Sequence, residues 1–156
     1  MWRTKVQEMK ANGRGVYGHV NCILEVKESG LMGAGNGVWI KEGEVIHNDE
    51  CITQYSGRKK KTTRGFSVDQ ILYSIELDDK TFIEGKKELS DGDGCGSLMN
   101  SAVVGRCLSL VSFRMVDNEC YAFAKTPEKY PLKGPLELFV TAGVGWWKTY
   151  RKEYEK

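Results

Sequence analysis

Short β-prone runs separated by glycine-rich or acidic turns constrain the fold of this chain more than any other sequence feature. Each run is about the length of one strand, and little of the chain has the 3.6-residue period of a helix. The chain also contains 18 Gly and only 3 Pro, a balance typical of tight turns and close backbone approaches. These features predict a mainly β fold. The predicted strands are residues 20–26, 38–40, 51–55, 71–77, 81–83, 108–115, 120–124 and 136–140.

Two pairs of these strands are separated by only a few turn-forming residues. Residues 71–77 and 81–83 flank an Asp-Asp-Lys turn, and residues 108–115 and 120–124 flank a Val-Asp-Asn-Glu turn. Such spacing predicts two antiparallel hairpins.

Three segments lie outside the strand pattern. Residues 1–18 are mixed and polar with no clear period, and we interpret them as an N-terminal extension. Residues 58–64 form a basic cluster, which we expect to be a charged loop; a nuclear address or a contact with an acidic partner is the alternative. Residues 146–156 predict a short terminal helix, because Trp146 and Tyr150 lie four residues apart.

Composition restricts the partners of the chain. A net charge of +2 gives no general reason to expect nucleic-acid binding. The five Cys are scattered and form no C-x-x-C pair, so we expect buried reduced thiols and no metal site. His19 and His47 also lack nearby metal-type partners. No apolar run reaches the length of a membrane span and no signal-peptide core is present, so we expect an intracellular protein, nuclear or cytoplasmic.

Two glycine-rich segments fail the tests for common ligand loops. Residues 33–38 do not fit a dinucleotide fingerprint, because they end in Val38 and precede a strand. Residues 91–96 begin like a calcium loop, but Ala102 stands where that loop needs a bidentate Glu.

Five segments, taken in order, resemble the signature of the SET domain, the family of lysine methyltransferases that use S-adenosylmethionine. The resemblance covers about residues 22–150 and is strongest to the PR subclass, which lacks the zinc-binding cysteines of other SET proteins. It implies a fold of several small antiparallel sheets with a knot-like C-terminal segment and a short C-terminal helix. The implied domains are an N-terminal extension (1–20), a SET domain (21–150) and a charged tail (151–156). The five segments are residues 29–39, 54–57, 98–102, 119–124 and 137–143.

The resemblance implies S-adenosylmethionine as the cofactor. In the family, the glycine loop lets the backbone lie against the methionine part of the cofactor; a simple turn is the alternative interpretation here. Asn100 would offer its amide donor and acceptor to the cofactor, although an Arg common a few residues earlier in the family is absent. The implied cofactor-binding residues are Gly35, Asn36, Gly37, Val38, Trp39, Tyr73, Asn100 and Ser101.

The implied catalytic positions are Tyr55, Tyr121 and Ala142. Tyrosine hydroxyls orient the target amine in the family, and the last segment usually ends in a Tyr-Gly pair. Here Ala142 occupies the tyrosine position. Taken alone, Tyr55 could also be an ordinary core tyrosine. The segment implied to close the substrate channel contains Trp146, Trp147 and Tyr150, for which packing of a terminal helix is the alternative.

Three accounts of Ala142 remain open: a motif alignment displaced by a residue or two, a degenerate natural SET domain, or an engineered inactive variant. The leading hypothesis is a protein-lysine N-methyltransferase of chromatin, acting on a lysine-containing protein or histone tail. The alternative is a non-catalytic SET-like protein-interaction module. A third hypothesis, nucleic-acid binding through residues 58–64, predicts a steep loss of affinity with salt.

Overall fold

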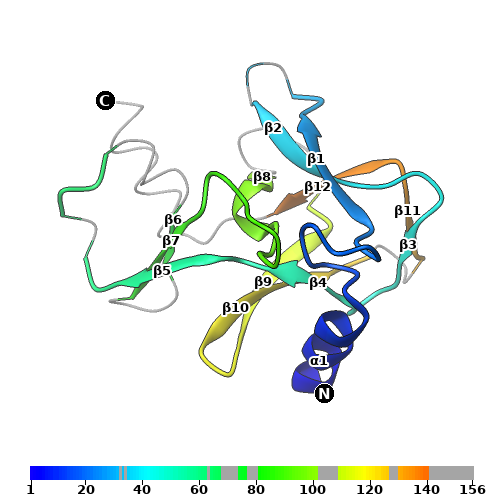
Figure 1. The fold of residues 1–156 in the computed structure, drawn as a ribbon, viewed down its shortest axis with the longest axis horizontal. Coiled ribbons are helices and arrows are strands. Elements are labelled where there is room, and N and C mark those ends of the chain that lie inside the picture. Colours follow the sequence, from blue (N-terminus) through cyan, green and yellow to red (C-terminus); the bar gives the residue numbers. More distant parts are fainter. Residues whose placement is uncertain are drawn as a thin grey trace.

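The computed structural model of the chain describes residues 1–31, 33, 35–62, 64–67, 74–76, 81–101, 109–126 and 130–140. These residues form one α-helix, one short 3-10 helix and twelve strands in three sheets (Figure 1). The mainly β fold with several small sheets is therefore confirmed. The described helices are α1 (Trp2–Asn12) and η1 (Gly96–Leu98).

The largest sheet has seven strands in the order β1-β2-β12-β9-β10-β4, with β8 pairing beside β12. A three-stranded sheet has the order β5-β7-β6, and β11 pairs with β3. The strands of the large sheet are β1 (Leu24–Glu28), β2 (Asn36–Ile40), β4 (Cys51–Gln54), β8 (Asn100–Ser101), β9 (Val111–Val116), β10 (Glu119–Ala124) and β12 (Leu136–Val140). The remaining strands are β3 (Val45–Ile46), β5 (Gly57–Lys60), β6 (Ser74–Glu76), β7 (Phe82–Gly85) and β11 (Leu132–Lys133).

Both predicted hairpin pairings are confirmed. Strands β9 and β10 pair antiparallel through a turn at Asp117 and Asn118, whose φ angles are 50° and 65°. Two successive positive φ values are typical of the turn that matches strand twist, and Asp and Asn tolerate them well. Strands β6 and β7 also pair antiparallel. The predicted strand at residues 136–140 coincides with β12.

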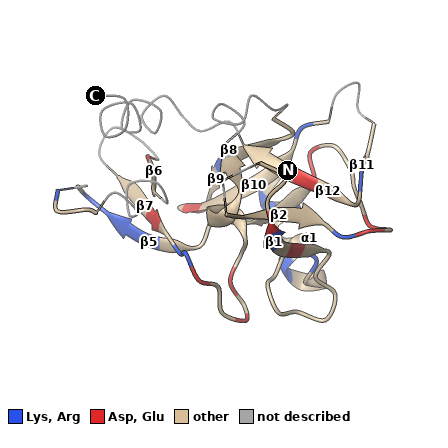
Figure 2. Ribbon diagram, turned by 90° about the horizontal axis from the view of Figure 1, so that it is seen from above, with Lys and Arg blue, Asp and Glu red and all other residues tan. Residues whose placement is uncertain are grey.

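Two expectations about charged segments are corrected. The first half of the expected loop at residues 58–64 is strand β5, which pairs with β7 along its length. Figure 2 shows the basic colour along this edge strand. Lysines on an edge strand discourage pairing with other chains, so a basic run is compatible with a strand there.

The polar N-terminal segment contains helix α1, which packs on the sheet instead of extending from it. Trp2, Val6 and Met9 lie at helical spacing, and the latter two are buried. The Trp2 ring meets Phe123 of β10 edge to face, with 4.9 Å between ring centroids. Only four of the eleven residues of α1 are apolar, so the helical period is weak, which explains why the sequence did not predict the helix.

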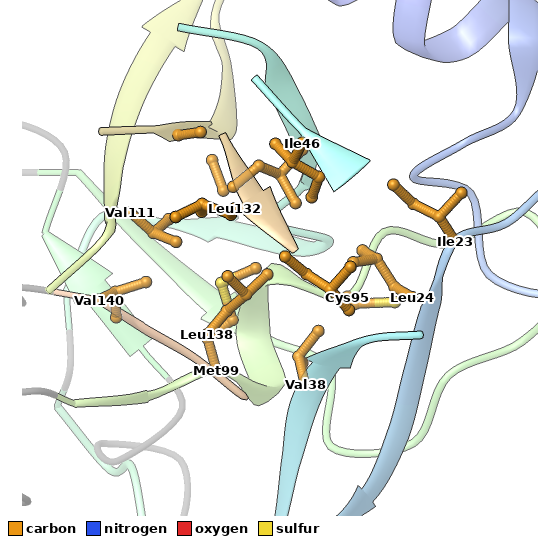
Figure 3. Packing of buried hydrophobic residues seen from close by; sticks show 14 of the residues in the cluster. Ile23, Leu24, Val38, Ile46, Cys95, Met99, Val111, Leu132, Leu138 and Val140 are labelled. Atoms are coloured by element: carbon orange, nitrogen blue, oxygen red, sulfur yellow. The ribbon is translucent and has the colours of Figure 1, made fainter. Parts of the chain in front are cut away.

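The main core lies against one face of the large sheet (Figure 3). Val38 from β2 and Leu138 and Val140 from β12 point into it, together with Cys95. The described cysteines are buried free thiols, as expected: Cys22, Cys51, Cys95 and Cys120. Burial raises the pKa of the last three of these thiols to about 12, so they are protonated and unreactive at neutral pH.

In the part of the chain that the structure describes, no helix has the length and apolarity needed to span a membrane. The same residues contain no cluster of three or more His, Cys, Asp or Glu side chains suited to a metal ion.

Candidate cofactor site

The face of the large sheet opposite the main core carries a row of polar and aromatic side chains. Strand register places Glu25 of β1 beside Trp39 of β2, and Trp39 beside Glu137 of β12. Successive strand residues point to opposite faces, so the neighbouring Val38 and Leu138 point into the core. Val38 is 0% exposed. Its predicted cofactor contact therefore cannot be made by its side chain.

Lys27 lies at the β1 end of this row and contacts both Glu25 and Trp39. The Nζ atom of Lys27 lies 2.8 Å from Glu25 Oε1 and 4.7 Å from the centroid of the Trp39 ring. The Trp39 indole nitrogen is buried, and no described residue accepts its hydrogen bond. Trp39 therefore lies between two glutamates: Glu25, which is paired with Lys27, and Glu137 on the neighbouring strand β12.

Glu137 joins three separate segments through its carboxylate, although only 6% of the residue is exposed. Its Oε1 accepts a 2.8 Å hydrogen bond from the Gly30 backbone N–H. Its Oε2 accepts from the Ser29 hydroxyl at 2.7 Å and from Asn100 Nδ2 at 3.3 Å. One buried carboxylate thus connects the loop after β1 to both β12 and β8.

The Glu137 carboxylate lies so close to the backbone of residue 37 that only glycine fits there. A Cβ atom at Gly37 would lie 2.2 Å from Glu137 Oε2 and 3.1 Å from Asn100 Nδ2. The space that a side chain would need at Gly37 is therefore filled by Glu137. Gly33 and Gly35 differ: their φ angles are 78° and 71°, and no described atom lies within 4 Å of a Cβ built on either. Among the described residues, the loop between β1 and β2 is therefore uncovered at these two glycines.

Asn100 lies where the predicted cofactor residues meet. Strand β8 runs parallel to β12, with Asn100 beside Phe139 and Ser101 beside Val140. Asn100 Nδ2 also donates to the Asn36 carbonyl oxygen at 3.3 Å. The amide NH₂ group of Asn100 therefore donates to two groups of the protein, the Asn36 carbonyl and the Glu137 carboxylate. The structure brings Asn36, Gly37 and Asn100 together.

Tyr55 follows β4 and is buried at 4% exposure. Its ring meets Phe113 of β9 edge to face, with centroids 5.2 Å apart, and it packs with Ile83 and Cys120. Its backbone N–H donates to the Cys120 carbonyl at 2.9 Å. These contacts hold the rings of Tyr55 and Phe113 in place near the junction of β4, β7 and β10. We call these two rings the aromatic wall.

The glycine-rich segment of residues 91–96 is hydrogen-bonded to the residues on either side of Gln54 and Tyr55, and it leads through η1 to Asn100. The Gly94 N–H donates to Ser56 Oγ at 2.8 Å, and the Cys95 N–H donates to Thr53 Oγ1 at 2.9 Å. A Cβ at Gly94 would lie 2.1 Å from the Gln54 carbonyl oxygen. The alternate glycines of residues 91–96 were the signal that could have revealed this close backbone contact.

Tyr121 does not lie beside Tyr55. It points to the other face of β10, where it is buried with Val6 and Met9 of α1. Its neighbour Cys120 is the residue that packs with Tyr55. The expectation that both tyrosines line one channel is therefore corrected, because strand alternation sends them to opposite faces.

Five predicted site residues lie outside the described residues, as does the expected terminal helix. They are Tyr73, Ala142, Trp146, Trp147 and Tyr150. For Ser101, only its backbone pairing with β12 can be described. Glu137 and Ser29 lie in the segments at residues 137–143 and 29–39 that resemble the family signature, but the resemblance assigns neither of them a role. A lone charge among the apolar residues of β12 was the available signal for Glu137.

No protein-family model and no curated protein matches the sequence. In fold, the chain is similar to the methyltransferase domain of human PR domain-containing protein 2. The match has a TM-score of 0.54 and 16% sequence identity, and covers 76% of this chain and 75% of that chain. The chain therefore has a mainly β, SET-like methyltransferase fold.

Proposed function

We propose that this domain is an S-adenosylmethionine-dependent protein-lysine N-methyltransferase of the PR-like type, without structural zinc. The observation that carries the proposal is the cluster in which Glu137 holds Ser29, Gly30 and Asn100 together beneath the glycine loop. The SET-like fold gives this cluster a context in which a methyl-donor cofactor is expected.

The residues present fit this cofactor. S-adenosylmethionine carries a sulfonium cation and an amino-acid group. The loop offers an open side at Gly33 and Gly35, and Asn100 offers an amide oxygen. Glu137 supplies a negative charge that has no basic partner among the described residues. Gly33, Gly35, Asn36 and Asn100 would hold the cofactor, with Glu137 behind them.

When bound, the cofactor supplies an electrophilic methyl group on a positively charged sulfur. The target lysine must be neutral to accept it, although its ordinary pKa is about 10.4. Tyr55 and Phe113 provide a buried aromatic wall that disfavours the ammonium form. The Tyr55 hydroxyl orients the amine, and the fixed geometry of β4 supplies the alignment that a direct displacement needs.

The substrate we propose is a lysine-containing protein segment, with a histone tail as the default. An extended peptide can add as a strand to a free sheet edge, and β1 and β4 are the ends of the large sheet. A protein that modifies such a substrate would act in the nucleus or the cytoplasm, so these are the locations that we propose for this chain.

Ala142 favours a second candidate function, a non-catalytic SET-like interaction module, because the alanine lacks the hydroxyl expected at that position. Replacing Ala142 by Tyr separates the two. For an enzyme with a weakened site, Ala142→Tyr should raise methyl transfer on the order of 10²-fold, the usual value of an orienting donor. Unchanged transfer would count against Ala142 as the catalytic position.

The first test is a calorimetric titration of the chain with S-adenosylmethionine. We expect one-to-one binding that Asn100→Ala weakens about tenfold, the equivalent of one hydrogen bond. Asn21→Ala, at an exposed position, is the matched control and should bind like the wild type. Absence of binding up to millimolar cofactor would overturn the proposed function.

A further inference from the structure

We propose that Glu137 makes this site select a cationic ligand over its neutral counterpart, so that it holds S-adenosylmethionine more tightly than the demethylated product. The inference rests on the proposed function and names Glu137 as a positioning residue that acts through its charge. The two ligands differ at one sulfur, which is a sulfonium cation in the cofactor and a neutral thioether in the product.

The first support is the burial of Glu137 among uncharged donors. Its carboxylate is held by the Ser29 hydroxyl, the Gly30 backbone N–H and the Asn100 amide. Only 6% of the residue is exposed. A buried carboxylate is normally paired with a cation, because desolvating an isolated charge is costly.

The second support is the arrangement of cations on this sheet face. None of the ion pairs of the described residues involves Glu137. Lys27, which lies on the same face, is engaged by Glu25 and by the Trp39 ring. The charge of Glu137 is therefore balanced by no side chain among the described residues, and a cationic ligand at the loop would supply the missing partner.

The third support is the conservation of charge through the reaction. Methyl transfer breaks the carbon–sulfur bond, forms a carbon–nitrogen bond and leaves the electron pair on sulfur. The positive charge therefore leaves the cofactor site with the methylated amine, and the amine loses a proton to solvent if it is to be neutral again. A carboxylate in a poorly solvated place attracts the cation more strongly than it would in bulk water. It would therefore weaken binding of the product relative to the cofactor.

An architectural role for Glu137 makes a different prediction. If the carboxylate only ties the loop to β8, its loss should weaken both ligands equally. Glu137→Gln removes the charge and keeps the size and most of the hydrogen-bonding capacity of the side chain. Ser29→Ala removes the hydrogen bond to Glu137 and the one that the Ser29 hydroxyl accepts from the Leu31 N–H, and it keeps the charge. Glu25→Gln is the matched control, because it is the same substitution two strands away on the same face.

The experiment is calorimetric titration of the wild type and these three variants with S-adenosylmethionine and with S-adenosylhomocysteine. We expect Glu137→Gln to weaken cofactor binding about tenfold and product binding less than about twofold, a difference equal to about 1.4 kcal/mol. Ser29→Ala should shift both ligands by a similar factor, and Glu25→Gln should shift neither.

Equal weakening of both ligands by Glu137→Gln, in a wild type that binds both, would overturn the charge role and leave the proposed function standing. A wild type that binds neither ligand would overturn both. If Glu137→Gln does not fold, the wild type alone decides: the product binding as tightly as the cofactor, or more tightly, would overturn the inference.

Discussion

Tyr55 and Tyr121 are almost equally buried and lie on paired segments, yet they belong to different regions of the molecule. The first region contains Tyr55, Ile83, Phe113 and Cys120, and we call it the Tyr55 region. The second, the helix region, contains Val6, Met9, Cys51, Val116, Tyr121 and Phe123. The residues beside Tyr55 are hydrogen-bonded to Gly94 and Cys95, in the segment that leads through η1 to Asn100, whereas the helix region is covered by α1. Two tyrosines that match the same family signature can therefore lie in separate buried clusters of the fold.

Removing the Tyr121 ring is expected to have the largest effect, and it tests whether Tyr121 belongs to the core and not to the cofactor site. Tyr121 is 2% exposed, so Tyr121→Ala leaves a cavity beneath α1 and should lower the free energy of unfolding by about 3–5 kcal/mol. Urea denaturation followed by circular dichroism measures the loss. Tyr121→Phe keeps the ring and should leave S-adenosylmethionine affinity unchanged.

Tyr130 provides the control for the loss of a phenol ring, because it is 70% exposed. Tyr130→Ala should change the free energy of unfolding by no more than about 0.5 kcal/mol. A stable Tyr121→Phe variant with impaired cofactor binding or methyl transfer would contradict the assignment of Tyr121 to the core.

A smaller effect tests how the Tyr55 region is joined to the rest of the site. The Thr53 hydroxyl is fully buried; it donates to the Gly15 carbonyl at 2.6 Å and accepts from the Cys95 N–H at 2.9 Å. Thr53→Val keeps the shape but leaves both backbone groups without this partner, at a cost of about 1–3 kcal/mol.

Thr53→Ser retains the hydroxyl and should lose only about 0.8 kcal/mol, the value of one buried methyl group. Denaturant unfolding of both variants separates the hydrogen bonds from packing. A Val variant as stable as the wild type, beside a Ser variant that loses stability, would show that the methyl group, and not the hydroxyl, matters at this position.

The difference between the regions also explains what the sequence could predict. Strand β12 and the β9–β10 hairpin were recovered because alternation and turn residues are local signals. The cluster at Glu137 was not, because Ser29 and Asn100 reach it from 108 and 37 residues away. Local pattern also could not assign Tyr121 to the helix region, since that depends on where α1 packs.

The smallest expected effect concerns the attachment of α1. Arg3 donates to both carboxylate oxygens of Asp117 in the β9–β10 turn, at 2.7 Å and 2.9 Å. The hydrogen bonds from Arg3 hold the pKa of the Asp117 carboxyl below its ordinary value. A carboxyl whose folded pKa is below its unfolded pKa stabilises the fold above the unfolded value, about 3.9, and loses this contribution as pH falls through the folded value.

Arg3→Gln should therefore lower the unfolding midpoint slightly at neutral pH, and its difference from the wild type should fade as the carboxyl is protonated. Both side chains are exposed, so the effect is small and should shrink further in high salt. Asp117→Asn is the companion variant, because Asn tolerates the positive φ of this turn. Midpoints of thermal unfolding for the wild type, both single variants and the double variant provide the measurement. If Arg3→Gln and the wild type have the same midpoint even at neutral pH, the first turn of α1 is held by the packing of Trp2 on Phe123 and Arg114, and not by the ion pair.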